Sequence, residues 1–420
     1  MSDSERHGIS VDIGTSNLTL HLIDLQSSEV LSERVISNPQ SEYGDEIISR
    51  MDAAREPDSS SKITSLVRQA IGVAMISMLV ETMQSSDSVE SIVIVGNTAM
   101  HHLFYGLPTD SLLRPPYNAD YKKAVFVPAA DVKLPFSRLT SCYSPPIVES
   151  YVGADAIAMM IDTDFPVSEK TIVSIDVGTN TEIAVLKGHK VWIASAASGP
   201  AFEGMSIQCG IPGGIGAISS VSIRKGGFRP ELEVIGGGKP SGVCGTGVVS
   251  ALASMLDAEI LLPRGSFNRT LSSPWLVLDT TIVHYILAPE DETLTGSNII
   301  LTQPDIRMLQ QSKAAIRGAF DLLLEHAGLS PEDIDELNLT GVFGTGLSID
   351  DAVRIGLFPE LPSAEVRQIC GGAIRGADLL HKEEYRNVAE RIAKEATHIN
   401  LTDNPAFKEK FAKSLEFPSR

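Results

Sequence analysis

Cysteine is scarce in this sequence, and basic residues are outnumbered by acidic ones. The four cysteines, Cys142, Cys209, Cys244 and Cys370, are scattered singly along the 420 residues. No pair has the CxxC spacing on which zinc sites and iron–sulfur clusters commonly rely. We therefore expect no iron–sulfur cluster in this chain, and we interpret the cysteines as small buried side chains.

The charge of the chain excludes one large class of partners. Lys and Arg number 34 against 53 Asp and Glu, which gives a net charge of −19. A field of this sign repels phosphate backbones and anionic membrane surfaces, so we expect neither nucleic acid nor a membrane as a partner. The first residues carry no apolar stretch, and the longest apolar run, residues 70–80, is too short to span a bilayer. These absences predict a cytoplasmic protein.

An internal repeat is the most informative feature that is present. Residues 9–22 read ISVDIGTSNLTLHL, and residues 173–186 read VSIDVGTNTEIAVL. Each copy predicts a strand, a tight D-x-G-T turn and a second strand, because apolar and β-branched residues flank a glycine. A repeat of this kind indicates a duplicated structural unit.

Segments outside the repeat indicate an α/β fold. Strand-like runs that end in glycines and precede helix-like segments recur at residues 91–107, 232–256 and 337–359. Because the chain has two similar halves, we predict two lobes with a nucleotide cleft between them. The predicted lobes are residues 1–165, with the first turn, and residues 166–420, with the second turn and the closing helices.

The chemistry of the repeated turns is suited to phosphate. A glycine without Cβ lets backbone N–H groups approach phosphate oxygens, and the threonine adds a hydroxyl. The aspartate at each strand end would repel a triphosphate unless a cation stood between them, so Asp12 and Asp176 are predicted Mg²⁺ ligands and catalytic residues. One isolated D-x-G-T could merely form a tight turn, but the duplication favours a clamp on Mg²⁺–nucleotide. The predicted nucleotide contacts are Gly14, Thr15, Ser16 and Asn17 in the first turn and Gly178, Thr179, Asn180 and Thr181 in the second.

Three further segments are weaker candidates for the same site. Glu149, in PPIVESYVGADA, could orient the attacking water or complete the metal shell; it could equally be a first-turn acid favoured by the helix dipole. Glu203 and Gly204, in SGPAFEGM, could meet a ribose hydroxyl, although structural turns explain this segment equally well. Residues 341–346, GVFGTG, lie between a strand and a helix, where backbone can approach adenine or ribose.

The order of these motifs resembles that of the superfamily of actin, sugar kinases and chaperone ATPases. A closer resemblance, to the ATPase domain of the reductive activators of corrinoid-dependent enzymes, extends from about residue 8 to the C-terminal string HINLTDNPAFKEKFAKSLEFPS. The other strings that carry it are NPQSEYGDEIISRM at 38–51, GNTAMHHLFYGLP at 96–108, DVGTNTEIAV at 176–185, SGPAFEGM at 198–205, CGTGVVSAL at 244–252 and GVFGTGLSIDDAVRIGLFP at 341–359.

The resemblance implies a two-lobed actin-like ATPase fold with duplicated ribonuclease-H-like lobes. Such activators use ATP hydrolysis to drive the uphill reduction of Co(II) cobalamin on a corrinoid protein to the Co(I) state. It implies ATP and Mg²⁺ at the two turns, with adenosine near Gly341, Gly344 and Gly346. It also favours a homodimer and a corrinoid-dependent methyltransferase as a further partner.

One departure from the family pattern concerns the electron. Members of the family usually carry an iron–sulfur ferredoxin domain, and this sequence lacks the cysteine spacing for a cluster. We therefore expect that the chain is a standalone or excised ATPase part and that a separate ferredoxin-like protein donates the electron. The alternative is that the chain has been put to another use. Two other functions stay open: a nucleotide-gated binding module for a corrinoid protein or methyltransferase, and a small-molecule kinase of the same superfamily.

Overall fold

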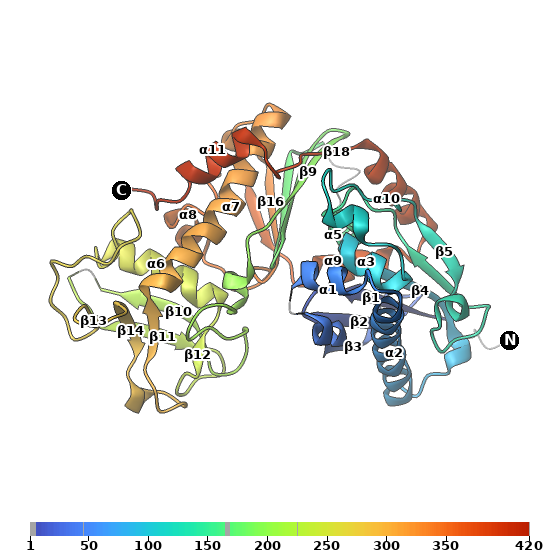
Figure 1. The fold of residues 1–420 in the computed structure, drawn as a ribbon, viewed down its shortest axis with the longest axis horizontal. Coiled ribbons are helices and arrows are strands. Elements are labelled where there is room, and N and C mark those ends of the chain that lie inside the picture. The colour runs from blue at the N-terminus through green and yellow to red at the C-terminus, as the bar shows by residue number, and fades with distance from the viewer. Residues whose placement is uncertain (1–5, 45, 164–168, 225, 420) are drawn as a thin grey trace. The chain divides into compact units, whose positions relative to one another are not determined.

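The computed structural model describes residues 6–44, 46–163, 169–224 and 226–419. The chain forms two compact units, and Figure 1 labels many of their elements. The first unit comprises Met1–Glu169, Gly188–Ile193 and Gly371–His398, and the second comprises Lys170–Lys187, Ala194–Cys370 and Ile399–Arg420. The lobe boundary predicted near residue 165 lies outside the described residues and stays a prediction. Residues 371–398, which that prediction assigned to the C-terminal lobe, belong to the first unit.

The first unit is built on a sheet with the strand order β3-β2-β1-β4-β6-β5. The central strand β1 is antiparallel to β2 and parallel to β4, and all of its residues except Asp12 are buried. The edge strand β3 alternates half-buried and exposed residues, as expected where one face of a sheet meets solvent. The strands are β1 His7–Ile13, β2 Asn17–Asp24, β3 Val30–Ser37, β4 Val89–Gly96, β5 Val125–Pro128 and β6 Ser141–Ser144, and β18 Ala396–His398 pairs with β9 Lys190–Ala196.

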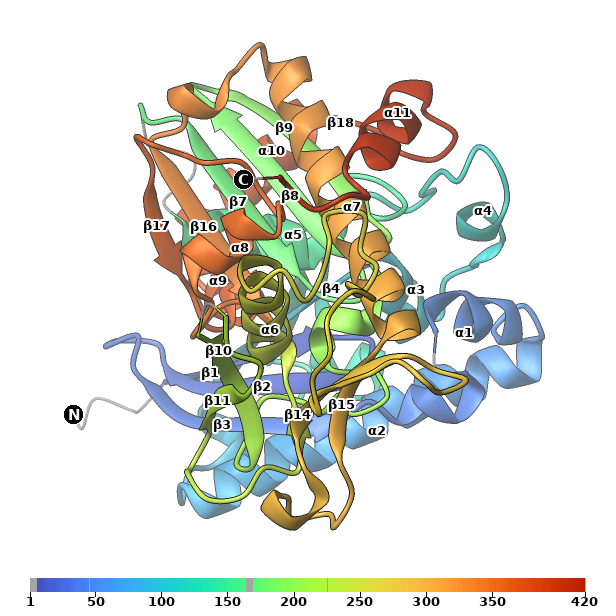
Figure 2. The ribbon, with the colours of Figure 1, turned by 90° about the vertical axis from the view of Figure 1, so that its left-hand side faces the viewer.

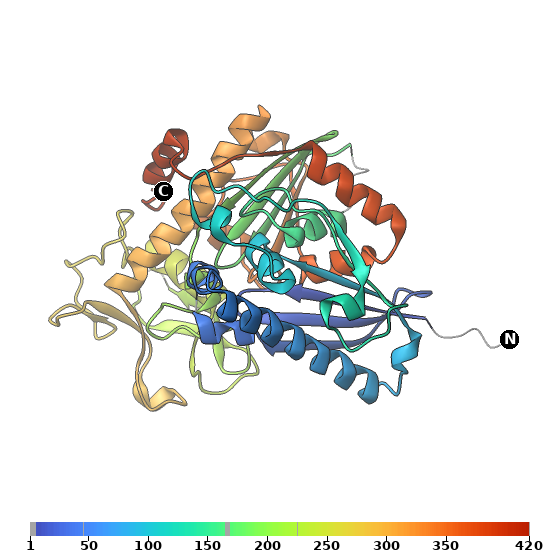
Figure 3. The same ribbon diagram turned by 45° about the vertical axis from the view of Figure 1, so that its right-hand side comes forward.

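Helices cover this sheet, and α2, Pro57–Glu81, runs along the strands β2 and β3 (Figure 3). Its buried residues recur every three or four positions, as in Ile63, Val67, Ile71 and Met75. α5 and α9 pack so closely that a Cβ on Gly376 would lie 1.8 Å from the Ala158 carbonyl oxygen. The other helices of this unit are η1 Pro39–Tyr43, α1 Ile47–Ala53, η2 Ser86–Ser88, α3 Thr98–Tyr105, α4 Asp110–Leu113, η3 Ala129–Val132, α5 Ala154–Asp162, α9 Gly372–Leu379 and α10 Glu383–Glu395.

The helix α2 corrects one expectation from the sequence. The apolar run at residues 70–80 belongs to a 25-residue helix, which by length and composition alone could cross a membrane. Half of its most apolar window is buried inside the protein, which is the pattern of a core helix in a globular unit.

The second unit repeats the arrangement of the first around β7. This strand is antiparallel to β8 and parallel to β16, and the order of its sheet within the unit is β17-β16-β7-β8. The two predicted hairpins, β1–β2 and β7–β8, are therefore confirmed, as is the α/β fold class. These strands are β7 Ile172–Val177, β8 Thr181–Lys187, β16 Glu336–Gly341 and β17 Glu365–Gln368.

Two smaller sheets complete the second unit, and α6 lies against β10 (Figure 2). Their strand orders are β11-β10-β12 and β13-β14-β15. The strands are β10 Ala217–Ile223, β11 Pro230–Val234, β12 Gly242–Val243, β13 Leu276–Val277, β14 His284–Ala288 and β15 Ile299–Thr302. The helices of the unit are η4 Pro200–Glu203, α6 Gly245–Asp257, η5 Glu290–Glu292, α7 Gln303–Ala327, η6 Pro331–Asp333, α8 Ile349–Arg354 and α11 Pro405–Lys413.

A buried lysine on α7 ties down the C-terminal segment. Lys313 is 1% exposed, and its Nζ donates a hydrogen bond of 2.7 Å to the Glu416 carbonyl and lies 5.2 Å from the centre of the Phe417 ring. Burial, with a smaller contribution from Arg317, lowers the pKa of Lys313 to about 7. The folded state therefore disfavours the charged form of this side chain.

We expect the stability of the protein to gain from Lys313 as the pH rises above about 7, because the unfolded chain then binds more protons at this position than the folded chain. The gain is at most about 1.4 kcal/mol per pH unit, and it ends near the pKa of an unperturbed lysine. The free energy of unfolding of Lys313→Met, measured with urea between pH 7 and 9.5, should lack this rise with pH. The exposed control Lys62→Met should keep the wild-type slope; a wild-type slope in Lys313→Met would contradict the prediction.

Candidate functional site

The first phosphate-turn candidate follows directly from the β1–β2 hairpin. Asp12 pairs with Thr19 and Ile13 with Leu18, which leaves residues 14–17 as the connection. A Cβ on Gly14 would lie 2.8 Å from the Asn17 carbonyl oxygen, so the tight turn requires glycine there. Thr15 is half-buried, whereas Ser16 and Asn17 are exposed. The turn thus presents hydroxyl groups next to the strand end that carries Asp12.

Two buried side chains from outside the hairpin hold this turn. Asn38 is fully buried; its Nδ2 donates to the Gly14 carbonyl at 2.8 Å, and its backbone N–H donates to the Ser16 carbonyl at 2.8 Å. Arg50, 1% exposed, donates from Nη1 to the Thr15 carbonyl at 2.6 Å. Three successive carbonyl groups of the turn are therefore satisfied by the protein interior.

Neither of these supporting residues was singled out from the sequence. Both lie in the string NPQSEYGDEIISRM at residues 38–51, which contributed to the family resemblance but was given no role in the site. Asn38 could have been recognised as a cap, because Asn followed by Pro39 is a common way to begin a helix, and η1 does begin there. Arg50 gives no such signal, since an arginine in an ordinary helix sequence is most often exposed.

The N-terminus of α5 contributes a third missed residue, Asp155. A Cβ on Gly153 would lie 2.5 Å from the Gly96 carbonyl oxygen, and one on Gly96 would lie 2.8 Å from the Ile13 carbonyl oxygen. The start of α5 therefore lies beside the ends of β4 and β1. Burial raises the pKa of Asp155 to about 6, against the lowering effect of the N–H of Ala156, which donates to its Oδ1 at 2.7 Å. A carboxyl group with this pKa can exchange protons near neutrality.

The structure places Glu149 ahead of α5, in a network of its own. Its Oε1 accepts from the N–H of Ala119 at 3.0 Å, its other carboxylate oxygen pairs with Lys122, and its carbonyl accepts from the Thr98 hydroxyl at 2.7 Å. The alternative that Glu149 is a first-turn acid is wrong, because α5 begins at Ala154 and its first-turn acid is Asp155. The catalytic role of Glu149 stays a prediction, although its carboxylate is already bound by protein groups.

The second turn candidate is held by residues that follow soon after it in sequence. The Ser198 hydroxyl donates to the Gly178 carbonyl at 3.0 Å, and the Gly199 N–H donates to the Thr179 carbonyl at 2.9 Å. Thr181 is fully buried, and its hydroxyl lies 2.7 Å from that of Ser198. Contact between Thr181 and a nucleotide would therefore have to come from its backbone. Asn180 is half-buried at the tip of the turn.

Glu203 lies at this second turn. Its Oε1 accepts a hydrogen bond of 2.6 Å from the Thr179 hydroxyl, and burial raises the pKa of its carboxyl group more than this bond lowers it. Gly204 ends η4 in the left-handed region at φ 79°, and a Cβ there would lie 2.2 Å from the Ile211 carbonyl oxygen. Glu203 therefore binds the Thr179 hydroxyl directly. Its contact with ribose stays a prediction.

The glycines of GVFGTG occupy three different environments. A Cβ on Gly341 would lie 2.4 Å from Oδ1 of Asp176, so this glycine, at φ 68°, makes room for the carboxylate of the second turn. Gly344 packs against the Ile369 carbonyl oxygen, whereas a Cβ on Gly346 would meet no atom within 4 Å. The structure therefore brings Gly341 to the second turn candidate, and the adenosine contacts of all three stay a prediction.

The donor set at the turns fits the coordination that Mg²⁺ prefers. Each turn offers a single aspartate at a strand end, and Mg²⁺ is usually bound by one or two carboxylates together with waters and substrate phosphates. Within the described ranges, no group of three His, Cys, Asp or Glu side chains is placed to hold a metal ion. One carboxylate at each turn suits a metal that arrives with a nucleotide.

Comparison with known proteins identifies the family. Residues 170–420 match the C-terminal domain of RACo, the ASKHA domain, and residues 7–168 match the RACo middle region. The chain belongs to the RACo family. This confirms the predicted resemblance and the actin-like ATPase fold, since the ASKHA domain is of that superfamily.

Relatives and a solved structure extend this match along the chain. The corrinoid activation enzyme RamQ of Eubacterium limosum is 32% identical over 420 residues, covering 98% of this chain and 70% of RamQ. The [Co(II) methylated amine-specific corrinoid protein] reductase of Methanosarcina barkeri is 27% identical over 385 residues, covering 84% of this chain and 66% of that protein. The structure of a reductive activator for corrinoid,iron-sulfur protein matches with a TM-score of 0.88 at 29% identity, covering 100% of this chain and 67% of that chain.

We expect Arg50→Met to lower the free energy of unfolding by about 1–3 kcal/mol, because the change leaves the carbonyls of Thr15 and Gly44 without their shared donor. Arg55→Met, a few residues along the chain, removes exposed ion pairs with Asp52 and Asp110 and should cost at most about 1 kcal/mol. Urea unfolding of both variants measures the difference. Equal losses in the two variants would show that Arg50 does not support the turn.

Proposed function

We propose that this chain couples the hydrolysis of Mg²⁺–ATP to the reductive activation of a corrinoid protein, from the Co(II) to the Co(I) state. The observation that carries the proposal is a match along nearly the whole chain to a corrinoid activation enzyme, together with a Co(II) corrinoid protein reductase and the structure of a reductive activator. The duplicated D-x-G-T hairpin supports the nucleotide part, because both copies form an antiparallel hairpin that places a glycine and a threonine at the turn, groups that suit phosphate oxygens.

In this proposal the two turns bind the phosphates of ATP. The hydroxyl of Thr15 and the backbone N–H groups around Gly14 and Gly178 contact phosphate oxygens. The hydroxyl of Thr179 does so once it leaves Glu203, to which it donates in this structure. Mg²⁺, when bound, neutralises the charge that develops on the phosphates. Asp12 and Asp176 hold the metal, directly or through waters.

Two carboxyl groups are candidates for orienting the attacking water. Asp155 has the more suitable environment, because its pKa of about 6 lies near physiological pH and it sits at the N-terminus of α5 beside the end of β1. Glu149, the residue chosen from the sequence, is bound by Ala119 and Lys122 and would first have to leave these partners.

ATP can drive an uphill electron transfer only through differential affinity. The states of the chain before and after hydrolysis must bind the Co(II) and Co(I) forms of the corrinoid protein unequally. One electron passes from a reduced ferredoxin-like donor to Co(II), which oxidises the donor's iron–sulfur centre and yields Co(I). The donor, a corrinoid-dependent methyltransferase and a homodimer are partners that we propose from the family, and the reaction would take place in the cytoplasm.

We expect ATPase activity to rise at least several-fold when a Co(II) corrinoid protein is added, because the partner stabilises one nucleotide state over the other. The measurement is phosphate release with and without the corrinoid protein, in the presence of a reduced ferredoxin, with Co(I) followed by its absorbance. Phosphate release that the corrinoid protein leaves unchanged would contradict the proposal. Stimulated release without Co(I) would favour a nucleotide-gated binding module.

We expect Asp12→Asn and Asp176→Asn each to reduce Mg²⁺–ATP hydrolysis by at least a hundredfold while leaving the fold intact, because each removes a carboxylate near the metal but no apolar contact. Circular dichroism and phosphate release measure the two effects. Asp131→Asn, on the surface of the first unit, is the matched control and should keep the wild-type rate. Wild-type hydrolysis in either turn variant would exclude the assignment of the turns.

A further inference from the structure

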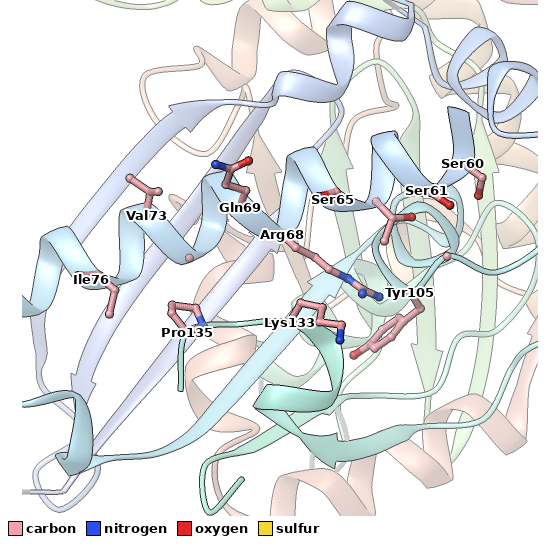
Figure 4. Close-up of a pocket in the computed structure, with 13 residues that line it drawn as sticks. Ser60, Ser61, Ser65, Arg68, Gln69, Val73, Ile76, Tyr105, Lys133 and Pro135 are labelled. Carbon is pink, nitrogen blue, oxygen red and sulfur yellow. The ribbon is translucent and has the colours of Figure 1, made fainter. Parts of the chain in front are cut away.

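The first unit has a hollow that lies apart from the turn at residues 14–17. It has a volume of about 840 Å³ and lies between α2, the C-terminal end of α3 and residues 133–135 (Figure 4). It shares no lining residue with the turn at residues 14–17. Its position leaves it unused by the proposed function.

Two cationic side chains reach into one end of this hollow. In Figure 4, Arg68 and Lys133 extend toward the same region, beside Tyr105. Arg68 is fixed by its Nε, which donates to the Phe104 carbonyl at 2.8 Å, and its guanidinium carbon lies 5.4 Å from the centre of the Phe104 ring. Within the part of the chain that the structure describes, neither the terminal nitrogens of Arg68 nor Nζ of Lys133 has a hydrogen-bond or ion-pair partner.

The lack of an acidic neighbour is unusual for this chain. Acidic residues outnumber basic ones by 53 to 34, yet none of the described residues that line the hollow is Asp or Glu. Half-burial of Arg68 weakens the hydration of its guanidinium group, whereas Lys133 is exposed. An anion bound by Arg68 would restore the hydrogen bonds that burial removes, and Lys133 would add a second favourable charge.

The remainder of the lining divides into a polar and an apolar end. Ser60, Ser61 and Ser65 lie toward one end of α2, whereas Val73 and Ile76 lie toward the other end, with Ile76 on the side of Pro135 and Val73 projecting beside Gln69 (Figure 4). Val73 is 66% exposed and Ile76 36%, so the apolar end is open to a ligand. A Cβ on Gly72 would lie 2.9 Å from Cδ of Pro135, which shows how closely the two walls approach there.

We propose that this hollow binds a small organic anion, with its carboxylate or phosphate group at Arg68 and Lys133 and its apolar body along Val73 and Ile76. Ligand sites of this size typically combine apolar walls with a few convergent polar groups that fix orientation. The guanidinium of Arg68 presents a planar pair of donors that fits a carboxylate or phosphate. The anchor of its Nε holds this pair in place before a ligand arrives.

The test uses 1-anilinonaphthalene-8-sulfonate, a fluorescent probe that joins an anionic group to an apolar ring system. The titration is made with the full chain in excess Mg²⁺–ADP, so that the phosphate turns are occupied. We expect a saturable rise in fluorescence that phenyl phosphate or hexanoate reverses and that inorganic phosphate at the same concentration does not. Whichever of the two competes at the lower concentration identifies the anionic group that the site prefers.

Two pairs of substitutions locate the site. The double variant Arg68→Gln/Lys133→Gln should bind the probe at least tenfold more weakly, whereas the control Lys62→Gln/Lys190→Gln, with the same change of charge, should bind it as the wild type does. If the double variant fails to fold by circular dichroism, Lys133→Gln alone, at an exposed position, should still weaken binding at least threefold. An absence of saturable binding in the wild type, or wild-type affinity in the cavity variants, would overturn the proposal.

Discussion

The placement of Asp12 and Asp176 depends on a buried central strand that ends one residue after each aspartate. β1 and β7 each pair antiparallel with the next strand in sequence and parallel with a strand from much later. A shift of either strand by one residue would turn its apolar side chains away from the core. The core therefore fixes the register of β1 and β7, and this register sets the positions of Asp12, Asp176 and the turns that follow them.

The two turns share a backbone design but receive different support. In the first unit the carbonyl groups of the turn are bound by Asn38 and Arg50, which come from a separate segment and are almost fully buried. In the second unit the equivalent support comes from Ser198 and Gly199, and Glu203 binds the hydroxyl of the turn. Duplication thus preserved the strand and the turn, whereas the residues that hold each turn differ.

The net charge of the chain and its individual basic side chains have different effects. The net charge of −19 sets a field that disfavours nucleic acid and anionic membranes. Locally, individual basic side chains occupy defined positions, with Arg50 at the first turn, Lys313 under the C-terminal segment, and Arg68 with Lys133 in the hollow beside α2. Arg50 and Lys313 are buried and hold the fold, whereas Arg68 and Lys133 line a hollow and can meet an anion despite the field of the whole chain.

The sequence by itself determined the α/β class, the two hairpins and the turn glycines, because these features rest on patterns and backbone angles among neighbouring residues. The family was indicated by the resemblance of its motif strings, in their order along the chain. It did not reveal Asn38 and Arg50 as supports of the first turn, the contact of Glu203 with Thr179, or the environments of Glu149 and Asp155. It also did not assign residues 371–398 to the first unit. Tertiary structure decided these points, because burial and hydrogen bonds between distant segments exist only once the core has brought those segments together.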